Sequence, residues 1–113
     1  MSKRPEREYL TDIVEAGRRI ITYLANMEYA AFLQDTKTQD AVVRNLEIIG
    51  EAAKQVSEEF KNASPQIPWK NIAGMRDKLI HDYFGVNLDI VWNVVKQDLP
   101  VLLNHLETKE LTE

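Results

Sequence analysis

Cysteine is missing from this chain of 113 residues. Its absence excludes disulfides, thiol nucleophiles and cysteine-ligated zinc together, so the sequence does not indicate a redox compartment. Histidine is scarce as well. The only two, His81 and His105, are expected to lie far apart in the fold, which disfavours a metal site. We therefore expect neither a metal nor another cofactor.

Long apolar runs and an excess of positive charge are also lacking. No apolar stretch approaches membrane-spanning length, and the first eight residues are charged with no apolar segment behind them. We expect neither a membrane span nor a signal peptide, and hence a cytoplasmic protein. The net charge of −4 argues against a general nucleic-acid coat, so any contact with nucleic acid must be local.

The composition is typical of one soluble globular domain. Hydrophobic residues make up 44% of the chain and charged residues 28%, and a chain of this length can bury one core but not two. We predict a single domain over residues 1–113. No segment shows the alternation that is typical of strands, so the predicted fold is all-α.

Apolar residues recur at three- and four-residue steps along four long segments. The predicted helices cover residues 6–27, 36–61, 68–83 and 87–106, and a further short turn is expected within 27–33. Four helices with short connections predict an up-and-down four-helix bundle with short extra helical turns.

Individual residues refine this prediction. Asp35 or Thr36 can cap the second helix and Asn87 the fourth, because their side-chain oxygens accept from free backbone donors. Gly17 has a low helix propensity, which indicates close packing at that position. Pro100 is expected to bend the last helix.

The densest polar chemistry lies between Gly74 and Gly85. Arg76 is a permanent cation whose planar donors suit a phosphate, and His81 can exchange a proton near neutral pH. Asp77 lies four residues before His81, on the same helical face, where it can orient the ring and favour its protonated form. A structural histidine, hydrogen-bonded near a helix end, is the alternative interpretation of His81.

Helical geometry limits how Arg76 and His81 can cooperate. Five residues at about 100° each rotate one position by about 140° from the other, so one straight helix converges them poorly. Either the helix loosens before His81, or a second copy brings its own helix alongside and completes a composite site. We therefore expect a homodimer.

A second polar group lies on the second predicted helix, where Arg44, Glu47 and Glu51 follow one side at three- and four-residue steps. A solvated face with ion pairs between neighbours is one interpretation. A groove or an interface is the other.

The pattern Arg76-x4-His81-x-Tyr83, with Asp77 directly after the arginine, resembles the signature of the HEPN superfamily. It is most similar to the HepT-like toxins, which are paired with a minimal nucleotidyltransferase antitoxin. At Asp77, relatives often carry asparagine. Three further blocks resemble the family in the same order: residues 41–54 its second helix, 67–77 the approach to the active-site helix, and 91–100 the final helix.

The resemblance implies a metal-independent endoribonuclease that acts as a toxin. His81 would serve as the acid or base, Arg76 would hold the phosphate oxygens, and Asp77 would orient either group. The antitoxin is implied to neutralise the toxin by transferring AMP from ATP to Tyr83, which could alternatively pack at a dimer seam. The competing class is a non-catalytic helical homodimer that binds a nucleotidyltransferase or a nucleotide.

Overall fold

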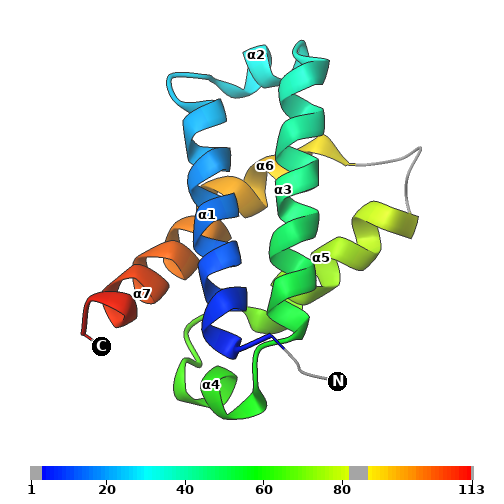
Figure 1. The fold of residues 1–113 in the computed structure, drawn as a ribbon. Coiled ribbons are helices and arrows are strands. Elements are labelled where there is room, and N and C mark those ends of the chain that lie inside the picture. The colour runs from blue at the N-terminus through cyan, green and yellow to red at the C-terminus, as the bar shows by residue number, and fades with distance from the viewer. Residues whose placement is uncertain (1–3, 82–86, 113) are drawn as a thin grey trace.

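Helices account for all the regular structure in residues 4–81 and 87–112, the part of the chain that the computed structural model describes. The side chains at positions 76, 78–81 and 108–112 lie outside this description. The elements are α1 (Glu6–Leu24), α2 (Tyr29–Leu33), α3 (Thr36–Lys54), α4 (Glu58–Ala63), α5 (Trp69–His81), α6 (Leu88–Asn93), the π-helical turn η2 (Val94–Asp98) and α7 (Leu99–Thr112) (Figure 1).

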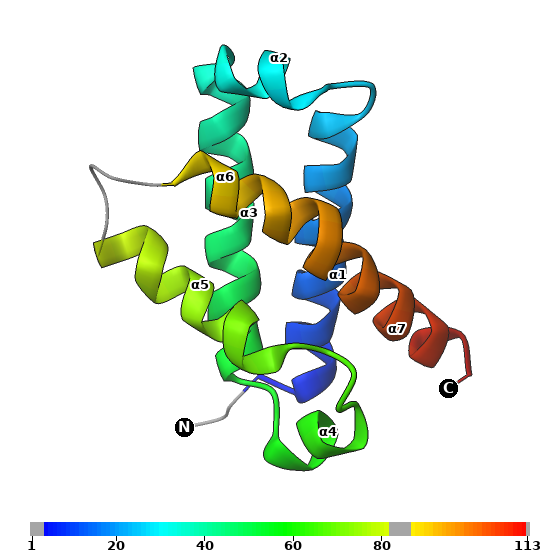
Figure 2. The same ribbon diagram turned by 180° about the vertical axis from the view of Figure 1, so that it is seen from behind.

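The long helices form two crossed pairs. In one pair, α1 and α3 run antiparallel, joined at the top of Figure 1 by the short α2. Helix α5 and the continuous rod of α6, η2 and α7 cross the far side of this pair at an incline, as the view from behind shows (Figure 2). The predicted all-α four-helix fold with short extra turns is confirmed. None of the described helices is long and apolar enough to span a membrane.

Two predicted helix caps are present. The Asp35 carboxylate accepts hydrogen bonds from the backbone N–H of Thr38 at 3.0 Å and from its hydroxyl at 2.6 Å. These two bonds, the hydroxyl first, hold the pKa of Asp35 below its ordinary value. The side-chain oxygen of Asn87 likewise accepts from the backbone of Asp89 and Ile90 at the start of α6.

The predicted helix over residues 36–61 is wrong at its C-terminal end, because the structure contains two helices there. Helix α3 ends at Lys54, and α4 starts after Ser57, whose hydroxyl accepts from the backbone N–H of Phe60 at 3.1 Å. The Glu6 carboxylate of α1 in turn accepts from the backbone N–H of Ser57 at 2.5 Å. A serine whose hydroxyl and backbone both have such partners favours a helix start over a helix interior.

The first predicted helix is also shorter than expected. It ends at Leu24 instead of residue 27, and Asn26 adopts a left-handed backbone conformation with φ of 62°. Asparagine tolerates this conformation better than most residues. A residue in the left-handed conformation cannot continue a right-handed α-helix, so the helix ends here.

The effect of Pro100 differs from a simple bend. The π-helical turn η2 ends at Asp98, two residues before the proline, and Figure 2 shows α6, η2 and α7 as one continuous rod. Proline lacks an N–H, and its ring displaces the carbonyl four residues earlier, that of Lys96 within η2. A widened turn accommodates both effects without a sharp kink.

One apolar core joins the four long helical segments. Its most deeply buried members include Ile13, Ile20, Val42, Phe32, Val91, Leu102 and Leu106. The close packing predicted at Gly17 is confirmed, because a Cβ atom there would lie 2.6 Å from Cδ2 of Leu103 in α7. Glycine at this position lets α1 and α7 approach closely.

Candidate functional site

Helix α5 carries the polar motif, and its N-terminal half is fixed in the core. Trp69, Ile72 and Met75 are buried, and the indole N–H of Trp69 donates to the backbone carbonyl of Ser64 at 3.2 Å. The motif starts at the next residue, Arg76. The scaffold therefore holds one half of the helix while the other half carries the polar positions.

His105, the second histidine, is hydrogen-bonded through both ring nitrogens to other parts of the fold. Its Nε2 lies 2.9 Å from the hydroxyl of Ser64, which is completely buried, and its Nδ1 lies 2.5 Å from the side-chain amide of Gln66. These hydrogen bonds join α7 to the segment that leads into α5. Within the described part of the chain, no three His, Asp or Glu side chains gather where they could hold a metal ion.

The backbone of α5 bears on the geometry of Arg76 and His81. It remains α-helical from Trp69 to His81, so helical periodicity still separates the two positions by about 140°. Loosening before His81, one of the two expected ways to bring them together, is not seen in the backbone. The side chains of Arg76 and His81, and Tyr83 altogether, lie outside the described residues.

Asp77, the supporting residue expected between them, has a partner on another helix. Its Oδ1 accepts from Nζ of Lys54, the last residue of α3, at 2.8 Å. The two side chains are 50% and 35% exposed. This ion pair ties α3 to α5 at the residue directly after Arg76.

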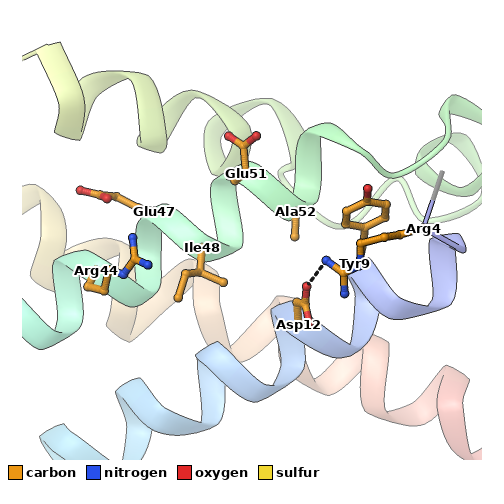
Figure 3. A pocket seen from close by; sticks show the side chains of 8 residues that line it. All are labelled: Arg4, Tyr9, Asp12, Arg44, Glu47, Ile48, Glu51 and Ala52. Carbon is orange, nitrogen blue, oxygen red and sulfur yellow. Dashed lines mark hydrogen bonds and ion pairs between the residues drawn. The ribbon is translucent and has the colours of Figure 1, made fainter. Parts of the chain in front are cut away.

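The second predicted group, Arg44, Glu47 and Glu51, lines a groove of about 340 Å³ between α1 and α3 (Figure 3). The two carboxylates project from α3 toward the α5 side, and Ile48 and Ala52 contribute apolar surface. The structure thus brings all three residues to one concave surface.

Helix α1 and the residues before it supply the other wall of this groove. The guanidinium of Arg4 pairs with Asp12 at 2.9 Å and lies 4.8 Å from the centre of the Tyr9 ring. The hydrogen bond that Arg4 donates to the Asp12 carboxylate raises the pKa of Arg4. The groove therefore combines cations, carboxylates and an aromatic ring.

Sequence reasoning did not single out Lys54 or the α1 wall. The sequence did contain a pattern that points to Lys54, because this residue continues the three- and four-residue steps of Arg44, Glu47 and Glu51 on the same face of α3. No sequence pattern points to Arg4, Tyr9 and Asp12, since their place in the groove depends on how α1 packs against α3. The motif at the end of α5 was detectable from sequence alone.

Comparisons with known proteins agree on one family. A family model described as "Ribonuclease HepT-like" matches residues 13–108. A protein of Thermococcus cleftensis named "Probable ribonuclease HepT" is 49% identical over 105 residues, which cover 93% of this chain and 96% of the relative. A protein of Methanocaldococcus jannaschii, provisionally named as an RNase, is 47% identical over 107 residues, covering 95% and 88%. No solved structure matches the chain significantly.

Proposed function

This chain belongs to the HepT-like ribonuclease family of the HEPN superfamily, and on that basis we propose that it is a metal-independent endoribonuclease. The observation that carries the proposal is the family match over residues 13–108, which includes the whole of α5. The anchoring of α5 by Trp69, Ile72 and Met75 supports a rigid platform for the polar residues that follow.

The proposed reaction uses the RNA itself as the nucleophile. The 2′-hydroxyl oxygen attacks the adjacent phosphorus as its proton passes to a base. The bond from phosphorus to the 5′-oxygen breaks, and that oxygen takes a proton from an acid. The products are a 2′,3′-cyclic phosphate and a 5′-hydroxyl. His81 serves as the base that takes the first proton or as the acid that supplies the second. Arg76 stabilises the negative charge on the phosphate oxygens.

Cleavage of RNA in the presence of a chelator tests this proposal. The parent protein should cut RNA under these conditions, and Arg76→Ala and His81→Ala should each lose activity by about a hundredfold or more while melting normally. Arg19→Ala, which removes an exposed arginine from α1, is the matched control and should keep activity. Equal inactivity of the parent and of His81→Ala would favour the non-catalytic binding module.

We further propose that two copies of the chain complete the site. Continuous α-helix through His81 leaves Arg76 and His81 on different faces of one copy, and this supports a contribution from a partner. Mixing Arg76→Ala with His81→Ala, after dissociation and reassociation, tests the arrangement. If the two groups come from different copies, half the dimers contain both variants and one site in each is intact. About a quarter of parental activity should then return; sites built within one copy would give none.

The family resemblance also supports a toxin that is paired with a nucleotidyltransferase antitoxin, which transfers AMP to Tyr83. An added phosphate beside Arg76 would compete with RNA for the same cation. Mass spectrometry of the chain, produced together with a nucleotidyltransferase encoded beside it, tests this step. The expected result is a tyrosine-bound AMP that Tyr83→Phe removes. An unmodified Tyr83 in a neutralised complex would contradict it.

A further inference from the structure

The ion pair between Lys54 and Asp77 joins α3 to the part of α5 that carries the motif. Nζ of Lys54 lies 2.8 Å from Oδ1 of Asp77, and the two side chains are 35% and 50% exposed. A dissolved molecule can therefore reach both groups. Because Asp77 directly follows Arg76 in α5, the ammonium lies beside the backbone of the proposed site.

This ion pair is expected to contribute little to the stability of the fold. An ion pair as exposed as this one stabilises a protein little, because water screens the charges and two long side chains lose freedom. An ammonium group carries three hydrogen-bond donors, and Asp77 takes one of them. Lys54 therefore has donor capacity beyond this single bond.

The Asp77 carboxylate creates an electrostatic difficulty for a site that binds RNA. It adjoins Arg76 and lies one helical turn before His81, so its negative charge would repel a phosphate bound there. The chain as a whole has a net charge of −4, which adds to this repulsion. The positive charge of the Lys54 ammonium offsets the negative charge of the Asp77 carboxylate, directly after Arg76 in the chain.

We propose that Lys54 is a phosphate-binding residue of the ribonuclease site, which contacts a backbone phosphate of the bound RNA while Asp77 holds its ammonium in place. The inference rests on the proposed ribonuclease function and adds a residue from α3 to a site otherwise assigned to α5. The contact forms when RNA binds, before the reaction starts. It therefore contributes to the affinity for RNA and little to the rate of the bound complex.

Binding of a non-cleavable RNA, with a 2′-O-methyl group on each ribose, separates this role from a structural one. Lys54→Gln should weaken binding about tenfold and reduce the slope of log affinity against log salt by about 0.7, the value for one phosphate contact on a single strand. The kcat on cleavable RNA should change little. Lys54→Arg should retain most of the affinity and the full slope.

Asp77→Asn gives the discriminating comparison. It breaks the same ion pair but leaves the cation, so it should keep the salt slope of the parent. Lys37→Gln is the matched control, because Lys37 is an exposed lysine in the first turn of the same helix, about 25 Å from Lys54. It should leave affinity and slope unchanged, and thermal melting confirms that each variant is folded.

Three outcomes overturn the inference. If Lys54→Gln matches Lys37→Gln in affinity and slope while the parent cuts RNA, Lys54 binds no phosphate and the nuclease proposal stands. If Lys54→Gln and Asp77→Asn lose the same slope, the ion pair acts only through structure. A parent that neither binds nor cuts RNA overturns the proposed function and, with it, this role of Lys54.

Discussion

The close approach of α1 and α7 at Gly17 can be tested by adding a single methyl group. A Cβ atom at Gly17 would lie 2.6, 2.9 and 3.1 Å from Cδ2, Cδ1 and Cγ of Leu103, so that side chain must move. Leu103 is buried, and overpacking of this kind costs about 1–3 kcal/mol. Alanine gains about 1 kcal/mol over glycine in a helix, so Gly17→Ala should destabilise the protein by about 0–2 kcal/mol.

A double-mutant cycle measures the contact itself. Leu103→Ala alone should cost about 2–5 kcal/mol, because it leaves a cavity. In the double variant the new methyl group occupies part of that cavity and meets no clash. The free energy of unfolding, measured in urea, should therefore fall by at least about 1 kcal/mol less than the sum of the two single changes.

Gly74→Ala is the matched control, since Gly74 also lies in a helix and a Cβ atom there would meet nothing within 4 Å. It should raise the free energy of unfolding by about 0.5–1 kcal/mol. Additive effects at Gly17 and Leu103, or the same gain at both glycines, would refute the close approach of α1 and α7.

Two further predictions concern other parts of the fold. Asp35→Ala should lower the Tm at pH 7, because it removes the acceptor for both hydrogen bonds from Thr38. The folded-state pKa of Asp35 is lowered, so its contribution is complete above the unfolded pKa and is lost as the pH falls through the folded pKa. The Tm difference from the parent should therefore narrow below about pH 4, and a constant difference across that range would contradict this assignment. His105→Ala should reduce the free energy of unfolding in urea by about 1–3 kcal/mol, because it leaves the buried Ser64 hydroxyl without this partner. Cleavage of RNA per folded molecule should stay unchanged, and its loss would show that His105 belongs to the reaction.

The parts of the fold that local chemistry determines could be predicted from the sequence. The apolar spacing predicted four long helical segments, and Asp35 and Asn87 cap helices as their side-chain oxygens suggest. The break before α4 could not be predicted. Val56 and Phe60 continue the apolar stripe, and the serine that starts α4 is held by Glu6, a residue 51 positions away.

The same limit applies to the site. Arg76 and His81 could be proposed as site residues because the motif is contiguous in sequence. The partner of Asp77 was not, because Lys54 lies 23 residues earlier and reaches Asp77 only through the packing of α3 against α5. The groove likewise needs α1 and α3 to lie side by side before Arg4, Tyr9 and Asp12 can line the same surface as Arg44.

The division of α5 into a buried half and a motif half has a genetic consequence. Met75 is the last residue of this helix whose side chain the structure describes as buried, and the residues assigned to the reaction follow it. Under the proposed function, one codon change at Arg76 or His81 therefore silences the nuclease while the cell still makes a folded protein. If that nuclease acts as a toxin, as we propose, a host can disarm it in this way without deleting the gene.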